Sequence, residues 1–165
     1  VSISRRELEF LLACETTGRE RFLVLGLLSR HFATALWSNE KDERLTQVHY
    51  YGYADYYKQM PHIFHDAKIN LNIALRVIQT GIPLRVLDVM GCCGFVLTNY
   101  REEIAEHFVN GVECVIYEDI EDMYAKAQYY LSHDTERRQI AANGLAKVQR
   151  DFTFEQALTG MLGAE

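Results

Sequence analysis

The residues best suited to chemistry lie between Gly81 and Gly94, where Arg85 and Asp88 stand three positions apart among four glycine or proline residues. Pro83 suits the first position of a helix, because its missing N–H costs nothing there, and Gly91 or Gly94 suits the end of that helix. The spacing then places Arg85 and Asp88 on one helical face. Two interpretations of this pair stay open: a ligand-binding pair, or an ion pair at the surface.

The first turn of this expected helix has the properties of an anion site. Its backbone N–H groups, around Gly81 to Leu84, would point to the edge where the carboxyl ends of parallel strands meet. Ligands bind at that edge in open α/β sheets. The pattern therefore predicts a phosphate site at this helix start.

A second interpretation of the same stretch makes Arg85 to Val89 a strand, followed by the glycine loop of an S-adenosylmethionine-dependent methyltransferase. The glycine spacing argues against it, because Met90 intervenes and Gly91 and Gly94 are three apart. The β-prone run that begins at Phe95 argues against it more strongly, since four residues cannot join two parallel strands. We therefore expect a helix, with the methyltransferase as the enzyme alternative.

The rest of the chain alternates short strands with longer helices, which is typical of a parallel α/β sheet. We expect a single domain over residues 1–165, Rossmann-like and three-layered, with a mainly parallel sheet of about five strands. A capping box of Ser4 and Glu7 predicts the start of the first helix, and Thr17 to Glu20 predicts a break in it. The expected strands are 33–37, 48–50, 68–73, 95–98 and 114–117, and the expected later helices are 55–66, 83–91, 101–108 and 120 onward.

Composition excludes several classes of protein. The 165 residues are 48% hydrophobic and carry a formal charge of −6, which suits a soluble domain and argues against binding to nucleic acid or anionic membranes. No stretch approaches the roughly 18 apolar residues of a membrane span. Four cysteines without paired-ligand spacing predict a reducing, cytoplasmic location. The chain opens at Val1 without Met or a signal-peptide pattern, so we expect part of a larger protein.

Two groups of residues resemble metal ligands. The acidic run Glu118 to Asp122 begins an expected helix, where carboxylates favour the helix dipole, and this interpretation is preferred to metal binding. His62 and His65 lie three positions apart without a nearby acidic third ligand, and two histidines alone are a weak basis for predicting a zinc site. We therefore expect no metal and no other cofactor.

Three ordered segments, Lys68–Ile73, Gly81–Asp88 and Gly94–Tyr100, resemble the C-terminal domain of CgeB-like glycosyltransferases, a branch of the GT-B enzymes. The resemblance extends from about Val48 to Phe154. It implies one half of a GT-B enzyme, a Rossmann-like domain that binds a nucleotide diphosphate sugar without a metal ion. It also implies a missing N-terminal domain that binds the acceptor, without which little sugar transfer is expected.

The resemblance further implies roles for particular residues. Retaining GT-B families have two acidic residues eight positions apart, the first at the sugar and the second at the ribose of the nucleotide. Asp88 falls on the second position, whereas the first falls on Thr80, which is not acidic, so the resemblance transfers no acidic sugar contact to this chain. Arg85 would bind the diphosphate with two hydrogen bonds. The neighbouring stretch of Gly81, Ile82, Pro83 and Leu84 is expected to lie on the same diphosphate, which the backbone N–H groups in this stretch would bind.

The remaining donor-binding candidates each have a structural alternative. Asn70 and Asn72 lie on a strand that leads to the site, and Arg76 lies in the loop beyond, where turn formation is the alternative. Gly52 and Tyr53 would approach the base, with packing as the alternative for the tyrosine. Strand-end candidates facing the same edge are Thr98, Asn99 and Tyr100. A protein of this kind that bound no nucleotide would instead be a non-enzymatic α/β interaction module.

Overall fold

The computed structural model describes residues 3–77, 80–153, 155–156 and 158–159, so that Phe154 lies outside the described residues. The chain divides into two compact units, each described here by itself. The first comprises Val1–Gln59 with Ile73–Gly81, and the second Met60–Asn72 with Ile82–Glu165. The first unit holds α1 (Arg5–His31), β1 (Ala35–Trp37) and β2 (His49–Gly52). The second unit holds α2 (Met60–Asp66), β3 (Asn70–Asn72), α3 (Leu84–Gly91), β4 (Val96–Asn99), α4 (Glu102–His107), β5 (Val115–Tyr117), α5 (Ile120–Ser132) and α6 (Asp134–Asp151).

The helix α1 is continuous, so the predicted break at Thr17 to Glu20 is wrong. The predicted capping box at its start is confirmed, because Ser4 and Glu7 bond each other's backbone N–H groups. Thr17 is buried within the helix, on the same face as Val24 and Leu28 at helical spacing. This packed face runs through the predicted break, so tertiary packing overrides the local capping pattern.

The five strands found among the described residues are all parallel, as predicted, but they form two sheets and not one. In the first unit β1 pairs with β2, with a register shift between Leu36 and Trp37. In the second unit the strand order is β3-β4-β5. Asn72 lies opposite Thr98, and Asn99 lies opposite Tyr117, so the carboxyl ends of the three strands lie together.

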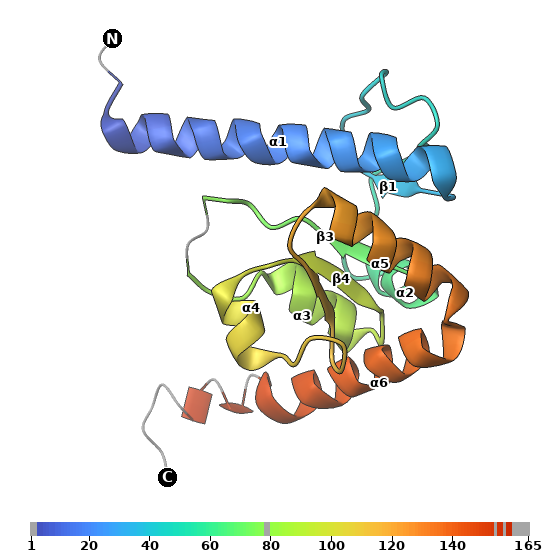
Figure 1. Cartoon of the computed structure of the whole chain (residues 1–165). Helices are drawn as coiled ribbons and strands as arrows, with labels where there is room; N and C mark the ends of the chain where they lie inside the picture. Colours follow the sequence, from blue (N-terminus) through green and yellow to red (C-terminus); the bar gives the residue numbers. More distant parts are fainter. Residues whose placement is uncertain (1–2, 78–79, 154, 157, 160–165) are drawn as a thin grey trace. The chain divides into compact units, whose positions relative to one another are not determined.

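The core of the second unit forms between the sheet and the buried face of α3. Val86, Val89 and Met90 of this helix are buried with Val96 and Ile116 of the sheet. The helices α3 and α6 contact each other (Figure 1). Gly144 permits this contact, because an added Cβ would lie 3.3 Å from Met90 Cγ and 2.7 Å from the Glu113 carbonyl oxygen.

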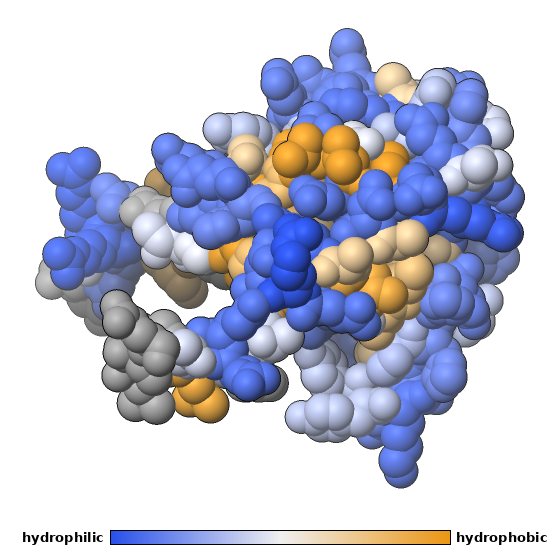
Figure 2. Space-filling view, turned by 90° about the horizontal axis from the view of Figure 1, so that it is seen from below, coloured by the Kyte–Doolittle hydropathy of each residue, from blue (hydrophilic) through white to orange (hydrophobic). Residues whose placement is uncertain are grey.

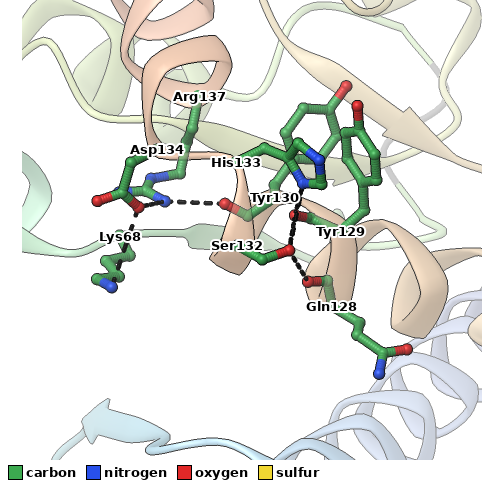
Figure 3. A network of polar contacts seen from close by, with 8 residues as sticks. All are labelled: Lys68, Gln128, Tyr129, Tyr130, Ser132, His133, Asp134 and Arg137. Atoms are coloured by element: carbon green, nitrogen blue, oxygen red, sulfur yellow. Dashed lines mark hydrogen bonds and ion pairs between the residues drawn. The ribbon is translucent and has the colours of Figure 1, made fainter.

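A buried arginine fixes the corner between α5 and α6 (Figure 3). The Arg137 guanidinium donates to the Tyr130 carbonyl oxygen at 2.8 Å and to Asp134 Oδ1 at 2.6 Å. The ring of Tyr129 stacks on His133 in the same corner, with 3.8 Å between the ring centroids. The end of α5 is thereby tied to the first turn of α6.

The face seen in Figure 2 is mostly hydrophilic, with hydrophobic side chains in separate groups. Within the described part of the chain, no helix has both the length and the apolar character that crossing a membrane requires.

Candidate functional site

The stretch from Leu84 to Gly91 is a helix, as predicted, so the strand reading and the methyltransferase alternative built on it are wrong. Pro83 is the residue before the first helical turn, with φ −58°, and its carbonyl oxygen accepts the Val86 N–H at 2.9 Å. Leu84 is 75% exposed, so the first turn of α3 is open to solvent.

Arg85 lies on this exposed first turn and is positioned by an aromatic ring. Its guanidinium carbon lies 5.2 Å from the centroid of the Phe64 ring, and Phe64 is buried on α2. A cation over an aromatic face is attracted by the ring quadrupole. Asp88 follows one turn later on the same helix and is half-buried. The two residues therefore have the predicted three-residue spacing on one helix, and the Arg85 guanidinium lies over the Phe64 ring of α2.

The chain after the C-terminal end of α3 packs closely against α2 and the first residue of β3. A Cβ on Gly94 would lie 2.6 Å from the Phe64 carbonyl oxygen and 2.8 Å from Asn70 Nδ2, so only glycine fits. Cys93 adopts a left-handed φ of 58° in the turn, and His65 Nδ1 lies 3.0 Å from the Cys92 carbonyl oxygen. These contacts fix the axis of α3, and with it the place of Arg85 and Asp88.

The strand-end candidates of the second unit divide into buried and exposed residues. Asn72 Nδ2 donates to Thr98 Oγ1 at 2.9 Å, and both side chains are buried. Asn99 is half-buried, whereas Tyr100 is 56% exposed and its backbone N–H donates to the Tyr117 carbonyl oxygen. The structure thus gives Asn72 and Thr98 a role in joining strands, and leaves Asn99 and Tyr100 nearer to solvent.

Five further candidates belong to the first unit. Gly52 ends β2 with a left-handed φ of 72°, and Tyr53 is 70% exposed. The Arg76 guanidinium pairs with Glu20 at 3.0 Å, and its backbone N–H donates to Thr17 Oγ1. Thr80 and Gly81 are exposed, and Gly81 has a left-handed φ of 92°. Arg76 is therefore held in an ion pair with α1.

The acidic run Glu118 to Asp122 lies at the start of α5 and caps this helix, as predicted. Asp119 Oδ1 accepts the Asp122 N–H at 2.8 Å, and the Asp122 carboxylate pairs with Lys126. Over residues 3–77, 80–153, 155–156 and 158–159, no three or more His, Cys, Asp or Glu side chains are grouped to hold a metal ion.

Sequence reasoning missed the residues that support the site from other elements. Phe64 is 21 positions before Arg85, and Glu20 is 56 positions before its partner Arg76. No local pattern links such residues, because each pair depends on how separate elements pack. Gly94 was predicted as a helix terminator, but the close approach of Phe64 and Asn70 is the reason it must be glycine.

Comparisons with known proteins show the family of this chain and the solved structures that share its fold. A family described as glycosyl transferase-like matches residues 5–163. No curated protein matches the chain. Among solved structures, TarM aligns with a TM-score of 0.71 and 13% identity over 88% of this chain and 31% of its own. Anabaena Alr3699/HepE, solved in complex with UDP-glucose, aligns with a TM-score of 0.67 and 14% identity over 88% of this chain and 45% of its own.

The C-terminal domain of a glycosyl transferase group 1 family protein (LpcC) from Francisella tularensis aligns with a TM-score of 0.65 and 16% identity, over 85% of this chain and 82% of its own. The chain thus spans less than half the length of TarM and HepE, but most of an isolated C-terminal domain. It has the α/β fold of the Rossmann-like domains of GT-B glycosyltransferases, and it belongs to the glycosyl transferase-like family.

Proposed function

We propose that this chain is the donor-binding part of a glycosyltransferase that uses a nucleotide diphosphate sugar, with the start of α3 as its diphosphate site. The observation that carries the proposal is the open first turn of α3, with Arg85 exposed on it and Asp88 one turn later. The family match and the UDP-glucose complex of the structurally similar HepE support it.

The chemistry of this helix start suits a diphosphate. The first N–H groups of a helix have no partner within it and lie at the positive end of its dipole, so they favour an anion. A guanidinium donates two parallel hydrogen bonds to phosphate oxygens. In our proposal the backbone N–H groups of Ile82 and Leu84 and the Arg85 side chain bind the diphosphate, and the Asp88 carboxylate accepts hydrogen bonds from the ribose hydroxyls.

The remaining assignments belong to the same proposal. Tyr53 stacks on the base beside Gly52, and Asn99 and Tyr100 border the donor at the strand ends. Thr80 takes the place of an acidic residue at the sugar, so it offers a hydroxyl where a carboxylate is usual. Arg76 is engaged with Glu20 in the first unit and Asn72 with Thr98 in the second, and we assign each of them to the stability of its own unit.

We further propose that the enzyme is CgeB-like and cytoplasmic, and that it acts without a metal ion. The acidic run that most resembles a metal motif is engaged in capping α5, which supports the metal-independent mechanism. The acceptor site is assigned to another domain of the longer enzyme. The chain alone should therefore bind a donor but transfer little sugar.

Calorimetric titration with UDP, GDP, ADP and S-adenosylmethionine, with and without EDTA, tests this function. We expect saturable binding of one nucleoside diphosphate that EDTA leaves unchanged. Arg85→Ala and Asp88→Ala should each weaken it about 10-fold or more, since a hydrogen bond to a charged group contributes about 1.5–3 kcal/mol. Arg138→Ala, at an exposed position on α6, is the matched control and should bind like the parent. Equal affinities of the parent and both site variants would refute the assignment.

A further inference from the structure

The turn that follows α3 holds two adjacent cysteines, Cys92 and Cys93. Both are free thiols at half-buried positions, whereas Cys114 is fully enclosed in the core. Cys14 lies on α1 in the first unit. Cysteine sulfur is a soft ligand, so two thiols joined by one peptide bond are suited to a soft metal or metalloid centre.

The backbone of this turn is fixed by contacts to its neighbours. The Cys92 N–H donates to the Asp88 carbonyl oxygen at 3.2 Å, and the Cys92 carbonyl oxygen lies 3.0 Å from His65 Nδ1. The Cys93 N–H donates to the Met90 carbonyl oxygen at 2.9 Å. Cys93 has a left-handed φ of 58°, which a non-glycine residue keeps only where its surroundings hold it. The two thiols therefore extend from an ordered backbone, which lowers the entropy cost of binding a ligand between them.

A direct disulfide between Cys92 and Cys93 does not suit this turn. Their shared peptide bond is trans, so their Cα atoms are about 3.8 Å apart, whereas a relaxed disulfide has its Cα atoms about 4.4–6.8 Å apart. Closing an S–S bond would therefore strain the backbone that the hydrogen bonds hold. A single atom bonded to both sulfurs closes a larger ring, so it joins the thiols with less strain.

The protonation of these thiols also favours such a ligand over an oxidant. Burial, with a smaller contribution from the Asp88 charge, raises the pKa of the Cys92 thiol. Oxidants and alkylating agents react with the thiolate, so a protonated thiol reacts slowly with them. An arsenical oxide instead condenses with two thiols. Two arsenic–sulfur bonds replace the arsenic–oxygen double bond, and the oxygen leaves as water with both thiol protons. Arsenic stays trivalent, so the step needs no oxidant or reductant.

We propose that Cys92 and Cys93 form a dithiol site that binds one trivalent arsenical, with a single arsenic atom bonded to both sulfur atoms. Such a chelate is stronger than an adduct with one cysteine, because the first bond holds the second thiol at a high effective concentration. The ordered turn and the half-buried position of both thiols support this site. It is independent of the proposed function, because neither thiol is assigned to the donor.

Binding of phenylarsine oxide tests the proposal. The protein is titrated with phenylarsine oxide in an excess of 2-mercaptoethanol, and intact-protein mass spectrometry measures the bound fraction. The excess monothiol competes with single-cysteine adducts but should not remove a dithiol chelate. We expect one phenylarsenic group per chain, and at least about 100-fold weaker apparent binding in Cys92→Ser and in Cys93→Gly. Glycine suits the left-handed φ at position 93, so Cys93→Gly removes the thiol and keeps the turn.

The remaining two cysteines provide the matched controls. Cys14→Ala and Cys114→Ala each remove one thiol outside the turn, and both should retain the arsenical like the parent. If either control loses it, a different pair of cysteines holds the arsenic and the proposal is overturned. Retention by Cys92→Ser or Cys93→Gly would overturn it as well, and so would a parent protein that retains none. Far-UV circular dichroism of each variant verifies the fold, so that lost binding reports the missing thiol.

Discussion

The side-chain amide of Asn72 donates a hydrogen bond of 2.9 Å to the hydroxyl oxygen of Thr98, its register partner on the neighbouring parallel strand. Both side chains are buried, with Thr98 fully enclosed. The bond therefore satisfies a polar pair at the carboxyl ends of β3 and β4, directly before the strand-end residues proposed to border the donor. A pair of this kind fixes the register of two strands, since both residues are buried and the hydroxyl of Thr98 has no access to water.

We predict that Thr98→Val destabilises the protein by about 1–3 kcal/mol, because it leaves the buried Asn72 amide without its acceptor. Replacing both partners, as Asn72→Leu with Thr98→Val, should cost less than the sum of the single changes, since no polar group is then left unsatisfied. Urea denaturation of the three variants and the parent measures this coupling. Strictly additive free energies of unfolding would show that the hydrogen bond does not link the two residues.

The sequence predicted the second unit well because its signals are local. Pro83 and Gly91 mark the two ends of one helix, and the β-prone residues after Gly94 form the next strand. Glycine and proline positions and hydrophobic periodicity were therefore enough to predict these elements. The break predicted at Thr17 failed for the opposite reason. At Thr17 the capping pattern favours a helix start, but the buried face that extends to Val24 and Leu28 stabilises one continuous helix.

The supporting contacts of the candidate site were beyond sequence reasoning for a physical reason. The position of the Arg85 guanidinium over the Phe64 ring requires that α2 and α3 pack side by side, and the Arg76–Glu20 pair requires that a loop meets α1. The division of the strands into two sheets is likewise a matter of tertiary arrangement. Strand propensity gives the segments, but it does not give their neighbours.

Gly94→Ala is expected to destabilise the protein by about 1–3 kcal/mol, the usual cost of overpacking. The new methyl group would lie 2.6 Å from the backbone oxygen of Phe64, which cannot turn away as a flexible side chain does. Gly91→Ala is the matched control, because a Cβ there meets nothing within 4 Å and the position is helical. It should be neutral or stabilising by up to about 1 kcal/mol. Thermal and urea unfolding distinguish the two, and equal stabilities would contradict the close approach seen at Gly94.

Arg137→Met is expected to cost about 1.5–3 kcal/mol, the range for a hydrogen bond to a charged group. The variant keeps an unbranched apolar stem but loses the bonds to the Tyr130 carbonyl oxygen and to Asp134. Arg138→Met, at the next and exposed position, should lie within about 0.5 kcal/mol of the parent. Urea denaturation gives both values. If the two variants lose the same stability, the corner between α5 and α6 does not depend on the buried guanidinium.

The buried thiol of Cys114 predicts a loss of stability at alkaline pH. Burial, with a smaller contribution from the Glu113 charge, raises the pKa of this thiol from its ordinary 9.0 to about 12. Above pH 9 the unfolded chain gives up the proton while the folded protein keeps it, so ionisation favours unfolding. The stability is fully present below pH 9 and is lost between about pH 9 and 12, at up to about 1.4 kcal/mol per pH unit.

Cys114→Ala removes this group, so its free energy of unfolding should fall less steeply than that of the parent above pH 9, whatever constant cost the smaller side chain adds. Tyrosines and lysines titrate in the same range, but they do so in both proteins, so the difference between the two curves isolates the thiol. Cys14→Ala, at a half-buried position on α1, controls for the loss of a cysteine as such. Urea denaturation at pH 8, 9.5 and 10.5 provides the curves, and parallel curves for parent and Cys114→Ala would show that the thiol ionises as readily in the folded protein as in the unfolded chain.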